Sequence, residues 1–215
     1  MKPIRILALL LVILSFFVSF YSYSLLPEKI ATHWGMSGEA NGFSEKSFGT
    51  YLLPIITLVV FELLVFFPKI DPMRRDAKGF EGYYDLFVLV IVGFFAYLNV
   101  ATILFNLGYL ADMNIMLIPA FAVLFYVMGI LLEHTKPNWF IGIRTPWTLS
   151  NETVWDKTHA LGAKLFKAIG ILALLSLFVP NYGFIVVVGL AVFGALGTVV
   201  YSYLEFRKLK RTKKQ

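Results

Sequence analysis

The sequence has no cysteine and few charged residues. Without cysteine it has no disulfides, thiolate nucleophiles, iron–sulfur clusters or cysteine-ligated zinc. Charged residues make up 15% of the chain and hydrophobic residues 59%, whereas about a quarter of a typical soluble domain is charged. Glycine-rich phosphate loops and the motifs H-E-x-x-H and G-x-S-x-G are also absent. These deficits exclude a water-soluble domain and indicate an integral membrane protein.

Long apolar runs are present instead. A transmembrane helix needs about 20 mainly apolar residues, and six runs approach or exceed that length, at residues 6–26, 49–67, 86–110, 115–133, 163–180 and 183–205. The first run lacks a small-residue cleavage site, so we interpret it as an uncleaved helix. The short connections at 111–114 and 181–182 predict antiparallel neighbours. The sequence therefore predicts an all-α membrane protein, a bundle of six transmembrane helices.

The basic residues predict the orientation of this bundle. Of the 19 Lys and Arg residues, only Lys29 and Lys46 fall on one face. The other face has Lys2, Arg5, Lys69, Arg74, Arg75, Lys78, Lys136, Arg144, Lys157, Lys164, Lys167, Arg207, Lys208, Lys210, Arg211, Lys213 and Lys214. The positive-inside rule then places both termini in the cytoplasm. The predicted location is the plasma membrane. This topology explains the net charge of +6 without nucleic acid as a partner. The predicted partners of the basic residues are membrane lipids.

The connections also suggest two units. Residues 1–68 form a predicted N-terminal two-helix unit with an outer loop at 27–48. Residues 69–215 form a predicted four-helix unit with an inner motif loop at 134–162 and a basic cytoplasmic tail at 207–215. No connection is long enough to fold as a separate soluble domain.

Several polar residues fall inside the predicted spans. Glu62 lies about four residues inward of the middle of its span, where a carboxylate costs about 2.5–3.5 kcal/mol. It either pairs with Lys167, which lies at nearly the same depth, or is protonated inside the bundle while Lys167 snorkels to the interface. Asn99 and Asn106 belong to a polar stripe that serves either helix-to-helix hydrogen bonds or a solute path. The last run has a small-residue packing face, with a dimer contact as a further option: Ala191, Gly194, Ala195, Thr198 and Ser202.

One group of acidic and histidine side chains lies on the predicted inner face: Glu133, His134, Glu152, Asp156 and His159. It is either an acid–base or metal site, or the solvated face of a helix that lies on the membrane surface, with Val154 and Trp155 dipping into the membrane. Ser150 or Asn151 would cap that helix. The solvated face is the favoured interpretation, so no metal, cofactor or catalytic residue is predicted.

Two loops contain distinctive motifs. The outer loop reads L-P-x-x-I-x-x-H-W-x-x-x-G and is predicted to cover the outer mouth of the bundle, with Pro27, His33, Trp34, Gly38 and, further on, Lys46 as candidate functional residues. The inner loop reads N-x-x-I-G-x-R-T-P-x-T-L-x-N-x-x-x-W-x-x-x-H, with Asn138, Gly142, Arg144, Thr145, Pro146, Asn151, Trp155 and His159 as candidates. Arg144 is either a buried anchor for a carboxylate or phosphate, or a snorkelling residue.

With these motifs the chain resembles the SdpI family of bacterial and archaeal membrane proteins, from the first helix to at least the fifth. The resemblance implies a six-helix immunity or signalling protein, with a membrane-active peptide toxin as outer partner and a transcriptional repressor as cytoplasmic partner. Two alternatives from other classes remain open. One is a small-solute or ion transporter that uses Glu62 and the polar stripe, and the other is a membrane-embedded enzyme that uses the acidic and histidine group.

Overall fold

The computed structural model describes residues 2–70, 79–179 and 182–212. Its long helices are α1 (Pro3–Ser22), α2 (Lys46–Ile70), α3 (Glu81–Asn106), α4 (Asn114–His134), α6 (Glu152–Leu175) and α7 (Gly183–Thr212). All six are long and apolar enough to cross a membrane, which confirms the predicted six-helix membrane bundle. Outside the described residues lie position 181 of the last short connection and Arg74, Arg75, Lys78, Lys213 and Lys214.

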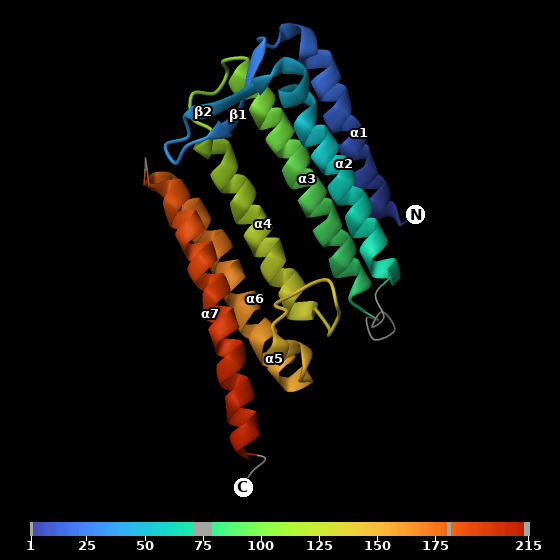
Figure 1. Cartoon of the computed structure of the whole chain (residues 1–215), viewed down its shortest axis with the longest axis vertical. Coiled ribbons are helices and arrows are strands. Elements are labelled where there is room, and N and C mark those ends of the chain that lie inside the picture. The colour runs from blue at the N-terminus through green and yellow to red at the C-terminus, as the bar shows by residue number, and fades with distance from the viewer. Residues whose placement is uncertain (1, 71–78, 180–181, 213–215) are drawn as a thin grey trace.

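The shorter elements lie at the two ends of the bundle (Figure 1). Strands β1 (Lys29–Trp34) and β2 (Ala40–Glu45) are at one end, which we call the hairpin end, and the 3-10 turns η1 (Tyr23–Leu25) and η3 (Ser176–Phe178) follow α1 and α6. The four-residue helix α5 (Pro146–Leu149) is at the opposite end, together with both chain termini. We call this opposite end the basic end.

The helices pack as two groups of three. Helix α3 packs on α1 and α2, helix α6 packs on α4 and α7, and a contact between α3 and α4 joins the groups. This grouping differs from a division after residue 68, because α3 makes its most extensive contact with α1. Buried side chains at this contact include Ala8, Val12, Val88 and Val92. Van der Waals packing between these side chains holds the two helices together, since lipid is as apolar as they are.

The polar stripe of α3 faces the interior of the bundle. Asn99 is buried, and its Nδ2 donates hydrogen bonds to the Ser15 carbonyl and to Ser19 Oγ on α1, both at 3.1 Å. At the basic end of the same helix, the buried Asp85 carboxylate accepts from Arg5 Nε at 2.7 Å. These contacts give Asn99 and Asp85 the helix-to-helix bonding role rather than the lining of a solute path.

Helix α6 begins eleven residues before the predicted fifth span, at Glu152 rather than residue 163. The Asn151 side chain caps it by accepting from the Val154 N–H at 3.1 Å. The expectation of a separate helix on the membrane surface was wrong. Val154 and Trp155 are completely buried within the protein, so they cannot dip into the membrane.

The small-residue face of α7 is a packing surface, as predicted. A Cβ on Gly194 would lie 2.7 Å from Ile169 of α6, and Thr198 and Ser202 are buried. Further along α7, the buried Glu205 carboxylate accepts from Lys157 Nζ of α6 at 2.9 Å. Much of this face therefore serves contacts within the chain.

Candidate functional site

The inner motif folds into a tight turn after α4, and Asn138 holds that turn together. Its buried Oδ1 accepts from the N–H groups of Phe140 and Ile141 at 2.9 and 2.7 Å. Its Nδ2 donates to the carbonyls of Lys136 and Ile141, both at 2.9 Å. Asparagine supplies two donors and an acceptor in one planar group, so this one side chain satisfies four backbone groups that the turn leaves without helical partners.

Gly142, Trp155 and His159 form the centre of the inner motif. Gly142 has a φ of 112°, and a Cβ there would lie 2.4 Å from His159 Nε2. That nitrogen accepts from the Ile143 N–H at 3.0 Å, and Nδ1 lies 2.8 Å from the Trp155 carbonyl. Because Nε2 is an acceptor, His159 is neutral and its proton is on Nδ1. The Trp155 ring stacks on His159 at 4.0 Å, and its indole N–H donates to the Thr135 carbonyl at 3.0 Å.

Thr145 and Pro146 start helix α5 and join it to α7. The Thr145 hydroxyl accepts from the Thr148 N–H, and Thr148 Oγ1 accepts from the Thr145 N–H, which together form a capping box. Pro146 occupies the first helical position, where a missing N–H costs nothing. The hydroxyl oxygens of Thr145 and Ser202 are 3.0 Å apart. The inner motif thus links α4, α6 and α7 through hydrogen bonds and ring stacking.

The Arg144 side chain is exposed, whereas Ile143 and Thr145 on either side of it are partly or fully buried. Its guanidinium donates to the Trp139 carbonyl, and no carboxylate in the described residues accepts from it. A cavity of about 600 Å³ is lined by Arg144, Trp139, Gly142 and Leu149. Trp139 and Leu149 are also more than half exposed. Arg144 is therefore exposed rather than a buried anchor for the bundle's own acids, and its one hydrogen bond to the described residues leaves its other donors available.

The outer loop forms an antiparallel hairpin that α3 holds in place. Asn106 accepts from the Ala31 N–H at 2.7 Å and donates to the Ala31 carbonyl at 3.1 Å. Its amide group therefore takes the position of a neighbouring strand on the free edge of β1. Ile30 and Leu26 are buried against Ile103 of the same helix. The predicted compact cover is thus a β-hairpin, and Asn106 supports it rather than a solute path.

The turn of the hairpin packs against the connection between α3 and α4. Gly38 has a φ of 81°, and a Cβ there would lie 1.7 Å from Asp112 Oδ1. The Gly38 carbonyl accepts from the Met113 N–H at 3.1 Å, and Asn114 Nδ2 donates to the Met36 carbonyl at 2.9 Å. Asp112 and Asn114 were not predicted from the sequence. The available signal was that both are polar residues in the short connection between the third and fourth apolar runs.

The other outer candidates are spread over the hairpin rather than gathered in one site. His33 Nδ1 lies 2.5 Å from Asn41 Oδ1 across the strands. Trp34 packs edge-on against Phe105 at 5.4 Å. Lys46 pairs with Glu28 at 3.4 Å and lies over the Tyr23 ring at 5.1 Å. The exposed Pro27 precedes β1.

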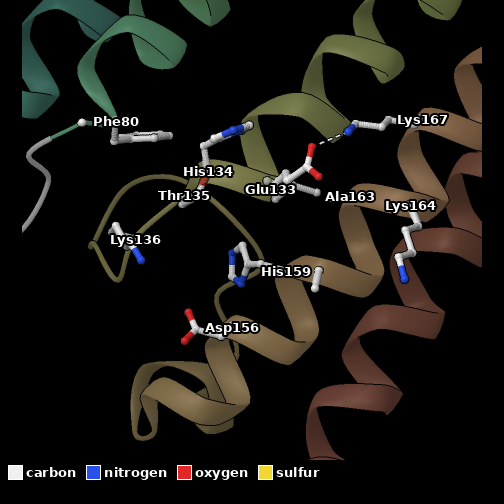
Figure 2. Close-up of a pocket in the computed structure, with 13 residues that line it drawn as sticks. Phe80, Glu133, His134, Thr135, Lys136, Asp156, His159, Ala163, Lys164 and Lys167 are labelled. Carbon is white, nitrogen blue, oxygen red and sulfur yellow. Dashed lines mark hydrogen bonds and ion pairs between the residues drawn. The ribbon is translucent and has the colours of Figure 1, made fainter.

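The acidic and histidine group at the basic end lies around a second cavity (Figure 2), of about 510 Å³. Glu133, His134, Asp156 and His159 line it together with Lys136, Lys164 and Lys167, and Glu152 does not. Lys167 pairs with Glu133 of α4. Among the described residues, no three His, Asp or Glu side chains are placed to hold a metal ion.

The predicted pairing of Glu62 with Lys167 is wrong, and the alternative of a protonated Glu62 inside the bundle is wrong too. Lys167 has Glu133 as its partner. Glu62 is exposed on the surface of α2, so its carboxyl is not inside the bundle in either protonation state. The two residues match in depth, but they lie on helices of different groups.

Comparisons with known proteins match the same two loops. Residues 134–202 match the model of the SdpI/YfhL protein family, and residues 10–58 match a domain of unknown function, DUF1648. The chain is 25% identical over 206 residues to the immunity protein SdpI of Bacillus subtilis (strain 168), which covers 95% of this chain and 97% of that protein. Residues 134–202 are therefore similar to the SdpI/YfhL family. No solved structure matches.

The segment that matches the SdpI/YfhL family model contains the whole inner motif together with α6 and most of α7. The resemblance pointed to Asn138, Gly142, Trp155 and His159, and the structure places them in one bonded unit. The residues that complete this unit, Thr135 and Ser202, were missed as partners. Both are small polar residues near the basic end of predicted spans, and this position was the only feature that could have predicted them as partners.

Proposed function

We propose that this multi-pass membrane protein is an immunity protein that protects the plasma membrane against a secreted, membrane-active peptide toxin. The match to an immunity protein over 95% of the chain is the observation that carries this proposal. The chemistry of the inner motif is consistent with it. His159, the histidine at its centre, uses both ring nitrogens for backbone hydrogen bonds, which suits a structural role better than acid–base catalysis.

A second part of the proposal concerns the basic end. Exposed Trp139, Leu149 and Arg144 lie around one cavity there. Aromatic residues and arginine are common in the centres of protein interfaces. We infer that this surface recruits a cytoplasmic transcriptional repressor, whose acidic groups would meet the outward-facing guanidinium.

Expression of this chain in a sensitive bacterium tests the immunity role. The cells are exposed to toxin-containing culture supernatant of the bacterium that encodes this chain. We expect cells that express the chain to survive better than cells with an empty vector, because the immunity protein protects their membrane from the toxin. Survival is measured by colony counts. Gly142→Ala, which is designed to disrupt the inner motif, serves as a destabilised comparison. Equal killing of cells that express the native chain and cells with an empty vector, by supernatant that contains active toxin, would contradict the proposal.

The proposed orientation places both termini and the inner motif in the cytoplasm. The chain has no cysteine, so single cysteines at Ser37 and Ser150, both exposed, give clean labelling sites. An impermeant maleimide is expected to label Ser37→Cys in intact cells and Ser150→Cys only after permeabilisation, because the positive-inside rule puts the basic end inside. Labelling of Ser150→Cys in intact cells would reverse the orientation, and labelling of both sites would contradict the six-span topology.

A further inference from the structure

A cavity with basic walls lies at the basic end of the first helix group. It has a volume of about 500 Å³ and is lined by Lys2, Arg5, Val65 and Lys69. Three of these four residues are cations, one on α1, one just before it and one near the end of α2. The cavity is separate from the inner motif and from the cavity around Glu133, since it shares no lining residue with either.

Buried Asp85 holds two of the cations in place. Its carboxylate contacts Lys2 Nζ at 3.0 Å and Arg5 Nε at 2.7 Å, and its side chain is only 3% exposed. Because Arg5 uses Nε for this bond, its two terminal amino groups keep their donors. Lys2 also pairs with Glu81, and this bond, followed by the one to Asp85, raises the pKa of Lys2 above its ordinary value. Both cations are therefore charged and fixed before any ligand arrives.

Among the described residues, the side chains around the cavity carry one more positive than negative charge. Lys2, Arg5 and Lys69 supply three positive charges, and Glu81 and Asp85 supply two negative ones. The Lys69 ammonium has no carboxylate within salt-bridge distance among the described residues. A singly charged anion would balance the charge of these five described side chains, and a phosphate diester has that charge.

The position of the cavity along the bundle agrees with a headgroup. Lys2 immediately precedes the span that begins at Pro3, and Lys69 is next to Ile70, the last residue of its span. Both are therefore at the level where the hydrocarbon core meets the headgroups. Val65 lies one turn deeper on α2 and gives the cavity an apolar wall on the hydrocarbon side.

From this geometry we propose that the cavity binds the phosphate group of an anionic phospholipid. Arg5 and Lys2 donate to the phosphate oxygens, Lys69 balances the remaining charge, and the acyl chains extend along α2 past Val65. The same phosphate chemistry is offered by free inorganic phosphate, so the experiment separates the two sources.

The full chain in a neutral detergent is titrated with phosphatidylglycerol, with phosphatidylcholine and with inorganic phosphate, and binding is followed by native mass spectrometry and by the thermal unfolding midpoint. Phosphatidylglycerol is expected to bind saturably and to raise the midpoint, whereas phosphatidylcholine does neither. Lys69→Gln is expected to lower the affinity for phosphatidylglycerol about fivefold, which corresponds to the contribution of one basic residue near an anionic headgroup. Lys69 is exposed, so this variant keeps the Asp85 contacts and the fold.

Lys210→Gln is the matched control, because Lys210 is an exposed lysine of the basic end that does not line the cavity. Its affinity for phosphatidylglycerol is expected to equal that of the native chain. Equal weakening by Lys69→Gln and Lys210→Gln would overturn the site in favour of diffuse attraction to basic residues, and so would an unchanged affinity in Lys69→Gln. Binding of inorganic phosphate as tight as that of the lipid, with the same loss in Lys69→Gln, would support the phosphate site and reject the lipid as its specific ligand.

Discussion

Replacing Gly142 by alanine is expected to destabilise the protein strongly. The residue has a φ of 112°, which costs an alanine about 1–3 kcal/mol. The new methyl group would also lie 2.4 Å from His159 Nε2, so the imidazole must move away from the Ile143 N–H. A buried donor left without its acceptor costs about 1–3 kcal/mol more. The measurement is the thermal unfolding midpoint in detergent, together with the yield of folded protein.

Gly108→Ala is the matched control for this change. Gly108 also has a positive φ, at 81°, but a Cβ there meets no atom within 4 Å. Both variants therefore carry backbone strain, and only Gly142→Ala forces a collision with His159. We expect the midpoint of Gly142→Ala to fall well below that of Gly108→Ala. Equal midpoints would mean that the close packing of Gly142 on His159 does not contribute to stability.

The six helices were predictable because uninterrupted apolar runs have few alternatives in a membrane protein. The start of α6 was not. Its first turns contain Glu152, Asp156 and Lys157, which lower the local hydropathy and end an apolar run near residue 163. The helix continues because Asn151 caps it and Trp155 and His159 are buried against the inner motif. Hydropathy reports the membrane-facing part of a helix and not its full length.

The partner of Lys167 was predicted wrongly for a similar reason. A depth argument compares residues along the membrane normal, but it does not determine which helices are neighbours. Helix α6 packs on α4 rather than on α2, so Lys167 meets Glu133 and Glu62 remains on the surface. One sequence gives the order of the helices along the chain and leaves their arrangement around the bundle open.

The candidate residues of the two loops were predictable in identity and less so in role. Asn151 was one of two predicted caps, and it caps α6, whereas the short helix α5 that begins at Pro146 was not predicted. The roles of Asn138 and His159 depend on backbone groups that only the folded turn brings to them. The strands of the outer hairpin were missed, because the edge of β1 is completed by Asn106, a residue 75 positions away in the sequence.

Arg144→Lys is expected to lose as much immunity and repressor recruitment as Arg144→Ala. The exposed guanidinium uses one donor for the Trp139 carbonyl, and its planar fork can hold a partner's carboxylate with the others at the same time. A lysine ammonium is a single point of charge, so it cannot reproduce two directed contacts. Survival against toxin and membrane recruitment of the repressor are measured at matched expression, with the thermal midpoint as a check on folding.

The folding check should separate Arg144 from the rest of the motif. Because the side chain is exposed and bonds to one backbone carbonyl in the described structure, its removal should cost only about 1 kcal/mol of stability. Arg207→Lys and Arg207→Ala are the matched controls, since Arg207 is an exposed arginine of the basic end outside the motif, and both should keep full immunity. Full immunity in Arg144→Lys with loss in Arg144→Ala would reduce the role of Arg144 to its charge. Full immunity in both would leave Arg144 without a part in the proposed partner surface, which would then rest on Trp139 and Leu149 alone.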